Sequence, residues 1–424
     1  MIQQFKFIIP QKLEDLSHPQ EDPNIFYVND ELTSLEIAQK LPESEAQLKE
    51  DPLNIIHEFN VFYSVLKNFN DLDPRTVDRA WILMFKTTDA FKEQLREIFS
   101  VLNESIGSQI LDITQHNRSS QNASLSQENR GNLFESLQEK LRHANALKML
   151  VYINCIFIQM FEDALASQTH RQNFNESYVE GATPAARRKK KQRINDNTKD
   201  VSFKSYDNYK NRVMKDLLQL ISTPLSKIAD SPTEAREIAG SVMRVCYKMI
   251  ENSSINSLTR DKELLEINFS ILGCGIEKYN QSLSFCLKFI QLLQYREQLA
   301  PLLADLVEFI VIRHEQRLLI GEILREIDRI DVKELSRDSS CPRAVSTFLI
   351  NLSEKCPHEF LPSLNHIFGH LEQDSYIMRN ASLSIMVNLI VKALSQRDED
   401  KALRDELLDA LLLHVKDITS YTRS

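Results

Sequence analysis

Glycine is the residue that most constrains this chain, because only 8 of its 424 residues are glycine, about 2% against an average near 7%. Tight left-handed turns, β-bulges and phosphate-binding loops depend on glycine, which adopts positive φ without steric cost. Its scarcity therefore argues against β-rich folds and against nucleotide-binding α/β folds. Leucine, isoleucine, glutamate, glutamine and lysine dominate instead, and most of these residues favour helices.

Apolar residues recur at helical spacing in the last part of the chain. Val345, Phe348, Leu349 and Leu352 follow the i, i+3, i+4, i+7 pattern of one helical face. Two further stripes are predicted, one of Leu383, Met386, Val387, Ile390 and Leu394, and one of Leu407, Leu408, Leu411, Leu412 and Val415.

Helix starts are marked by a capping residue followed by proline, which tolerates the first helical position because no backbone donor is needed there. Asp51-Pro52 and Asp73-Pro74 have this form. Ser231-Pro232-Thr233-Glu234 adds the glutamate of a capping box.

A repeat is visible near the end of the chain. Two similar turn-to-helix junctions place Arg379 and Arg423 44 residues apart (423 − 379 = 44), within the HEAT and armadillo period of roughly 40–47 residues. We predict an all-α, HEAT/armadillo-type α-solenoid with disordered insertions. Since the chain stops one residue after Arg423, we expect a longer solenoid truncated at its C-terminal end. The predicted inter-repeat ladder, with DNA contact as the lesser alternative for its arginines, consists of Asp374, Arg379, Asp417 and Arg423.

Composition divides the chain into four predicted parts. Residues 1–50 are an N-terminal extension broken by prolines, and 51–166 form an N-terminal helical block with a flexible loop at 114–131. Residues 167–205 are a disordered polybasic linker, because so polar a segment buries too little apolar surface to offset its ordering entropy. Residues 206–424 form the HEAT-repeat block.

The most apolar run, Met149 to Phe161, is shorter than the roughly 20 residues that span a bilayer, so we predict a buried helix and no membrane partner. Trp81, the only tryptophan, is predicted to lie in the core. Gly273 and Gly275 lack the third glycine of a phosphate loop and are predicted to permit close helix packing.

Catalytic motifs are missing from the sequence: there is no Walker A motif, nucleophile elbow or zinc-protease signature. We therefore predict no enzyme, no catalytic residue, no cofactor and no small-molecule substrate. His366 and His370 could reach a common metal with Glu359, Glu372 or Asp374, but two partly exposed helix histidines are the favoured interpretation, so no metal site is predicted. Six scattered cysteines without a C-x-x-C pair indicate reduced thiols.

A basic run interrupts an otherwise acidic chain. Six positive charges fall within seven residues, and without them the formal net charge changes from −9 to −15 (−9 − 6). Such clusters serve as nuclear-localisation signals or contact the DNA backbone; import is favoured, DNA contact is second and an inert linker third. Phosphorylation of Thr183, which precedes Pro184, would oppose this charge. The run consists of Arg187, Arg188, Lys189, Lys190, Lys191 and Arg193.

Seven groups of short segments follow one another in a characteristic order. They are Ile55-Ile56-His57-Glu58-Phe59, Asn145-Ala146-Leu147-Lys148-Met149, Cys246-Tyr247-Lys248-Met249-Ile250-Glu251-Asn252, Tyr279-Asn280 leading into Leu299-Ala300-Pro301, Gly321-Glu322-Ile323-Leu324-Arg325-Glu326-Ile327, Glu334-Leu335-Ser336-Arg337-Asp338, and Tyr376-Ile377-Met378-Arg379-Asn380-Ala381. No single segment is diagnostic. As a collinear set they resemble the N-terminal region of the condensin complex subunit 1 family, the non-SMC HEAT-repeat regulatory subunits of condensin.

This resemblance implies a regulatory scaffold that binds the kleisin subunit and the SMC ATPase heads and helps to engage double-stranded DNA during mitotic chromosome condensation. It also implies a location in the nucleus and on mitotic chromosomes, with part in the cytoplasm. A nuclear-transport adaptor is the alternative, because acidic solenoid grooves bind basic signals. An adaptor reads such signals in its cargo, whereas a chromosome subunit would contain one itself. Kleisin-contacting residues do not follow from the sequence.

Overall fold

The computed structural model describes residues 5–18, 22–101, 127–180, 204–254, 258–336, 339–371, 375–394 and 400–414. These residues are almost wholly helical, and the extended pairing among them is an isolated parallel bridge between Lys6 and Ile25. The chain forms two compact units, unit 1 (Met1–Ile271) and unit 2 (Leu272–Ser424). The predicted all-α class is thereby confirmed.

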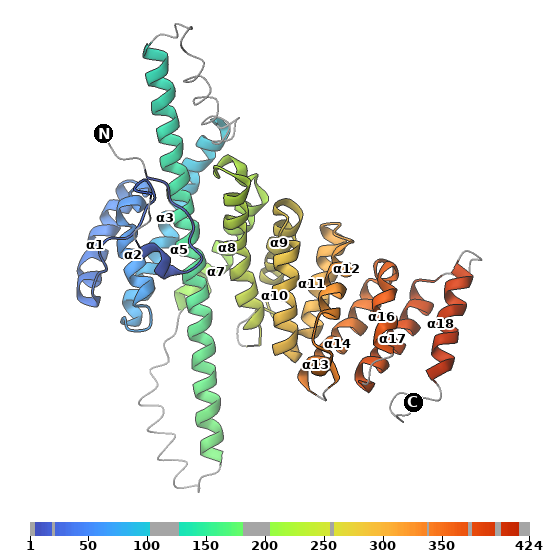
Figure 1. Ribbon diagram of the computed structural model, residues 1–424. Helices are drawn as coiled ribbons and strands as arrows, with labels where there is room; N and C mark the ends of the chain where they lie inside the picture. Colours follow the sequence, from blue (N-terminus) through green and yellow to red (C-terminus); the bar gives the residue numbers. More distant parts are fainter. Residues whose placement is uncertain are drawn as a thin grey trace. The chain divides into compact units, whose positions relative to one another are not determined.

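Unit 1 is built around the long helix α5, which packs against α2, α3, α7 and α8 (Figure 1). Two predicted helix starts are confirmed: Asp51 accepts a hydrogen bond from the Leu53 N–H at 3.0 Å, and Pro74 opens α3. Its elements are η1 (Leu13–Ser17), α1 (Ser34–Glu50), η2 (Pro52–Asn54), α2 (Ile55–Lys67), α3 (Pro74–Val101), α5 (Gln127–Glu180), α7 (Lys204–Ser222), η3 (Leu225–Lys227), α8 (Pro232–Glu251) and the first turns of α9 (Lys262–Tyr279).

The core of unit 1 is aromatic. Trp81 is fully buried, as predicted, and its ring meets Phe157 and Phe161 of α5 edge-on at centroid distances of 5.7 and 5.6 Å. Its indole N–H donates to the Ser205 carbonyl at 3.3 Å, so α3, α5 and the start of α7 meet at one residue. Beside it, the Tyr206 hydroxyl donates to the buried Glu162 carboxylate at 2.7 Å.

Unit 2 continues from the last turns of α9 as stacked helices in two layers (Figure 1). One layer contains α10, α12 and α16, and the other contains α11, α14 and α17. Successive helices of the second layer begin 40 and 36 residues apart, at Ala300, Ser340 and Tyr376, close to a HEAT period. The elements are α10 (Ser282–Tyr295), η4 (Glu297–Leu299), α11 (Ala300–Arg313), α12 (Leu319–Asp328), α13 (Val332–Ser336), α14 (Ser340–Lys355), α15 (Pro357–Phe360), η5 (Leu361–Ser363), α16 (Leu364–Leu371), α17 (Tyr376–Lys392) and α18 (Lys401–His414).

The apolar faces predicted for the helices of unit 2 agree with the buried residues to different degrees. All four residues of the α14 stripe are buried. On α17 the prediction is rotated: Met386 and Leu394 are buried, but Val387 is 46% exposed. The buried face of α17 consists instead of Met378, Ala381, Ile385 and Leu389, and α14 packs against it at the small residue Ala381. On α18 only Leu407 of the described stripe is buried.

Helix α5 extends further than composition indicates. Residues 127–131 and 167–180, predicted as loop and linker, belong to this helix. Once its centre is fixed by packing, each further residue adds a hydrogen bond at the cost of ordering only itself, so a helix continues through polar sequence. Its segment Gln138–Thr169 is apolar and long enough for a membrane span, yet 61% of its most apolar window is buried, as predicted for a core helix.

Candidate functional site

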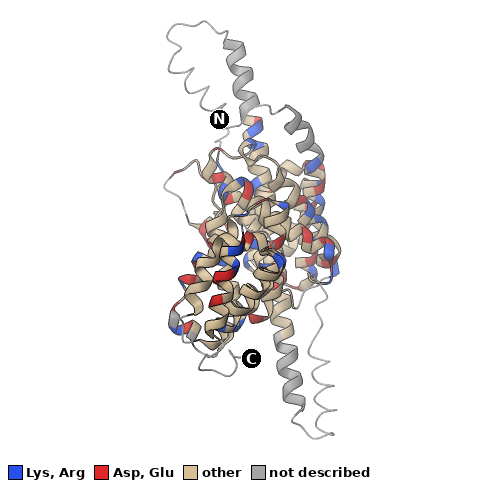
Figure 2. Cartoon of the chain, turned by 90° about the vertical axis from the view of Figure 1, so that its right-hand side faces the viewer, with Lys and Arg blue, Asp and Glu red and all other residues tan. Residues whose placement is uncertain are grey.

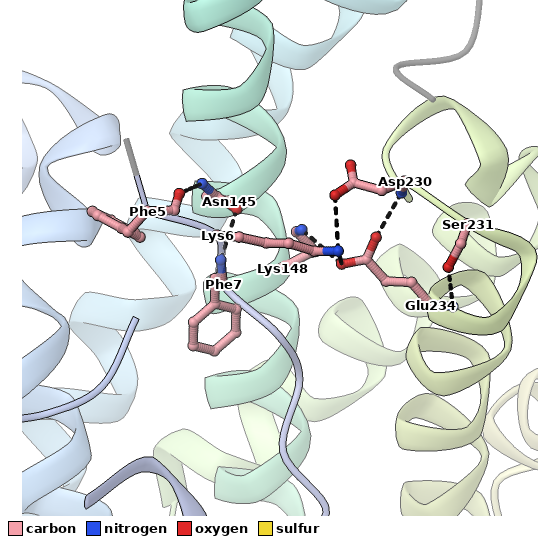
Figure 3. Close-up of polar contacts among 8 residues, drawn as sticks. All are labelled: Phe5, Lys6, Phe7, Asn145, Lys148, Asp230, Ser231 and Glu234. Carbon is pink, nitrogen blue, oxygen red and sulfur yellow. Dashed lines mark hydrogen bonds and ion pairs between the residues drawn. The ribbon is translucent and has the colours of Figure 1, made fainter. Parts of the chain in front are cut away.

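An extended N-terminal segment is held against α5 by one asparagine amide. The Phe7 N–H donates to Asn145 Oδ1 at 3.1 Å, and Asn145 Nδ2 donates to the Phe5 carbonyl at 2.8 Å (Figure 3). The Phe7 side chain is fully buried and contacts Phe59 and Tyr152. The side-chain amide thus pairs with backbone groups as a neighbouring strand would, and the surface of α5 holds this extended segment.

Lys6, which lies between Phe5 and Phe7, reaches a polar cluster at the start of α8. Its ammonium lies 2.9 Å from Asp230 and 3.9 Å from Glu234, while Lys148 of α5 lies 3.0 Å from Glu234 (Figure 3). The Lys148 and Glu234 side chains are only 2% and 6% exposed. Burial opposes the charge on Lys6, but its hydrogen bond to Asp230 and the nearby carboxylates outweigh burial and raise its pKa.

The capping box predicted at Ser231 forms only in part. Ser231 Oγ accepts from the Glu234 N–H at 3.2 Å, as expected of the N-cap of α8. The Glu234 carboxylate does not return to Ser231; it accepts from the Asp230 N–H at 2.6 Å and meets Lys148. The Glu234 carboxylate therefore links the N-terminal segment, α5 and α8.

In unit 2, two adjoining cavities follow the layer of α10, α12 and α16. The one between α10 and α12 has a volume of about 210 Å³ and the one between α12 and the α15–α16 segment about 440 Å³. Arg325 lines both, and its Nε donates to the Gly321 carbonyl at 3.1 Å. We call them the α12 groove; its other lining residues include Leu283, Glu322, Arg329, Arg317, Leu318, His358 and Glu359.

The α12 groove offers both charge signs next to exposed apolar side chains, of which Leu318 is 81% and Leu283 63% exposed. In the view of Figure 2, basic and acidic residues are interspersed along the described helices. Mixed donors and acceptors suit the backbone and side chains of a peptide, whereas a nucleic acid requires a surface of one sign.

His366 and His370 both lie near a carboxylate that the sequence did not suggest, while Glu372 and Asp374 of the suggested set lie outside the described residues. His366 forms a short contact with Asp328 of α12, and His370 Nε2 lies 3.6 Å from the same carboxylate. His370 is 2% exposed, so the expectation that both histidines are partly exposed is wrong for this one. The side chain of Asp328 comes from the preceding repeat, which helical spacing alone does not reveal.

The six cysteines are all reduced and buried. Burial raises the pKa of Cys155, Cys286 and Cys356 to about 12 and that of Cys341 to about 11. Such thiols stay protonated at neutral pH and make poor nucleophiles.

Most site residues predicted from sequence lie outside the described residues. These are the basic run Arg187, Arg188, Lys189, Lys190, Lys191 and Arg193, the phosphorylation candidate Thr183, and the ladder candidates Asp374, Asp417 and Arg423. Arg379 is described: it lies half-buried in the first turn of α17, where its N–H donates to the Ser375 carbonyl at 3.1 Å. All of these roles remain predictions.

Comparisons with known proteins agree along the chain. Residues 95–285 match the family described as the N-terminal part of non-SMC mitotic condensation complex subunit 1. Condensin complex subunit 1 of Xenopus laevis is 28% identical over 378 residues, 88% of this chain and 24% of that protein. The Homo sapiens protein of that name is 27% identical over 426 residues, 100% of this chain and 27% of that protein. The Schizosaccharomyces pombe one is 23% identical over 361 residues, 81% and 29% of the two chains.

The stacked helix pairs define an α-solenoid, and these matches show that the chain is similar to a non-SMC subunit of condensin. The chain is similar along its length to the N-terminal region of condensin complex subunit 1, and its residues 95–285 match the model of that family. It spans about a quarter of the length of the curated relatives it matches.

Proposed function

We propose that this chain is a regulatory scaffold of condensin that holds the kleisin subunit and the SMC ATPase subunits and aids the engagement of double-stranded DNA in mitotic chromosomes. The observation that supports it most is the match to proteins named condensin complex subunit 1 over 88–100% of the chain. On this proposal the subunit performs no chemical step and acts by binding in the nucleus and on mitotic chromosomes, with part in the cytoplasm.

The α12 groove is the proposed kleisin site. It crosses successive helices of one layer, so an extended segment would contact several repeats and gain affinity from each. Arg325, which lines both cavities, would donate to carbonyl or carboxylate groups of that segment.

A pull-down of the whole chain with the kleisin subunit tests this proposal. Specific capture is expected, and R325E should weaken it roughly tenfold or more, the effect of losing one charge-assisted contact. The matched control is R313E, because Arg313 is an exposed arginine at the end of α11 in the other layer. A folded chain that captures no kleisin would refute the scaffold role of these residues, while equal losses in both variants would refute only the groove.

For the basic run 187–193 we propose nuclear import first and DNA-backbone contact second. Contact with phosphates releases condensed counterions, so DNA binding through this run should weaken steeply with salt. The test replaces its six basic residues by glutamine and measures import of a fluorescent fusion and DNA binding at two salt concentrations. A phosphomimetic Thr183→Glu is expected to weaken whichever function the run has, and no change in either assay would remove Thr183 from consideration.

For Asp374, Arg379, Asp417 and Arg423 we propose the structural role of an inter-repeat ladder. R379A should then lower the stability of the unit 2 stack and leave DNA binding unchanged. A loss of DNA binding by an equally stable variant would favour the alternative role.

A further inference from the structure

Three side chains with metal-binding atoms converge at the ends of α9 and α11 in unit 2. Cys274 and Glu277 lie in the last turns of α9, and His314 is the C-cap residue of α11. One ligand atom from each of the three lies within 4.8 Å of the other two. Across the described ranges, no other group of three histidine, cysteine or acidic side chains meets this spacing.

Gly273 is what allows His314 to lie so close to α9. A β-carbon at position 273 would be 2.2 Å from His314 Cδ2 and 2.4 Å from Nε2, far inside van der Waals contact. Any other residue would therefore displace the imidazole ring. The sequence predicts close helix packing at Gly273; the group that approaches it is the His314 ring, whose position depends on this glycine.

The turn after His314 also fixes the ring. Glu315 has a φ of 55°, a left-handed conformation that is uncommon outside glycine. The side chain of Gln316 donates to the His314 carbonyl at 2.9 Å, which holds this turn. His314 Nδ1 lies 2.7 Å from Glu277 Oε2, so the ring orientation is defined from both sides.

Burial and charge suit a cation. Cys274 is 6% exposed, the His314 side chain 13% and the Glu277 side chain 41%. The cluster is therefore closed on its protein side and open to water at the carboxylate. A thiolate, a carboxylate and a neutral imidazole together carry a charge of about −2, which a divalent ion balances.

We infer that Cys274, Glu277 and His314 form a binding site for a divalent transition-metal ion of the zinc type, with water completing four coordination positions. A sulfur, nitrogen and oxygen set favours zinc, because magnesium and calcium prefer oxygen ligands alone. On binding, the Cys274 thiol releases its proton to solvent and forms the sulfur–metal bond, with no change of oxidation state. The ion ties the end of α9 to the end of α11. The site is independent of the partners proposed above.

Cobalt absorption and zinc calorimetry on the whole chain test this site. Co²⁺ is expected to give the near-ultraviolet charge-transfer band of a thiolate ligand, and Zn²⁺ should displace it with one ion per chain. C274S should abolish the band, and C274S or H314Q should weaken Zn²⁺ binding by about 100-fold or more, since even outer-shell changes cost roughly 10–100-fold. The matched control H366Q, which alters another histidine paired with a carboxylate, should bind as the wild type does.

G273A tests whether the position of the His314 ring matters for binding, because this variant keeps all three ligands and removes only the space that the ring occupies. It should weaken Zn²⁺ binding while circular dichroism shows an unchanged helix content. If G273A does not fold, E277Q tests the third ligand instead, and it is also expected to weaken Zn²⁺ binding. The inference is overturned if the folded wild type binds no Zn²⁺ in calorimetry, or if C274S and H314Q bind it as tightly as the wild type, which would identify an adventitious ion only.

Discussion

In unit 1 the Phe7 N–H bonds to Asn145, 138 residues away, and the Trp81 indole bonds to Ser205, 124 residues away. In unit 2 the long-range polar contacts are shorter in sequence: Lys355 meets Glu308 across 47 residues, and Asn388 meets Ser353 across 35. Unit 1 therefore closes large loops around one aromatic core, whereas unit 2 joins each helix pair to its neighbours. An array of that second kind is stabilised by nearest-neighbour contacts and opens piece by piece.

The largest test of this difference removes one core aromatic residue from each unit. W81A and F348A each delete a fully buried ring and should cost about 3–5 kcal/mol. Native-state hydrogen exchange should then rise throughout α3, α5 and α7 for W81A, but only in α14 and the helices beside it for F348A. An equal spread of exchange in both units would refute the contrast.

The second test breaks the buried ion pair of unit 1. K148M leaves Glu234 buried with Lys6 as its more distant partner, and should lower the free energy of unfolding by about 3–5 kcal/mol in urea titrations. The double variant K148M/E234M should recover most of that loss, because no buried charge remains unpaired. The unit 2 control K355M breaks a more exposed pair and should cost about 1 kcal/mol or less. If K148M lowers the free energy of unfolding no more than K355M does, the Lys148–Glu234 pair does not contribute substantially to the stability of unit 1.

The third test frees the N-terminal segment without touching the core. N145A leaves the Phe7 N–H and the Phe5 carbonyl without their partner, at a cost of about 1–3 kcal/mol. Limited proteolysis should then show early cleavage near Lys6 or Lys12 that the wild type does not show. The matched unit 2 variant N388A loses one side-chain bond to Ser353 and should leave the cleavage pattern unchanged. Protection of the N-terminal segment in N145A would contradict its dependence on this amide.

The smallest effect concerns the start of α9. The Leu264 N–H and the Asn211 side chain bond to Asp261 and lower the pKa of its carboxyl group below the ordinary 3.8. Because the folded pKa is lowered, this stabilisation is fully present above the unfolded value and is lost as pH falls through the folded value. D261A should cost about 1 kcal/mol at neutral pH, the size of an N-cap contribution. The difference should vanish in acid, and a constant difference down to pH 2 would exclude the carboxylate as its source.

Much of the fold follows from local sequence rules. The α14 stripe and the start of α3 at Pro74 are set by residues within a turn or two of each other. The apolar neighbours of Trp81 in sequence predict its burial, although the rings that cover it come from α5. The α17 face is missed because apolar side chains cover more than one side of that helix, and Ala381 and Ser382 are buried only because α14 lies against them. Helix type is a local property, whereas helix rotation depends on the neighbour.

The candidate sites were less predictable for the same reason. Lys6, Lys148 and Glu234 carry no shared motif, and their meeting depends on how α5 and α8 are packed. Asp328 faces His366 only because consecutive repeats are stacked in this register. Gly273 is the exception: its unusual place in a helical pattern marked a close approach, although nothing in the sequence named His314 as the group that approaches.

The two hydrogen bonds between Asn145 and the N-terminal segment have a consequence for synthesis of the protein. Translation proceeds at roughly 5–20 residues per second, and the partner of Phe7 lies 138 residues downstream. The N-terminal segment therefore waits roughly 7–28 s on the ribosome before Asn145 exists, with its buried phenylalanine still exposed. Lys355, by contrast, follows Glu308 by 47 residues, a delay of roughly 2–9 s. The N-terminal segment thus exposes an apolar side chain for longer than the segments of unit 2 do, and it has the greater need of protection from aggregation during synthesis.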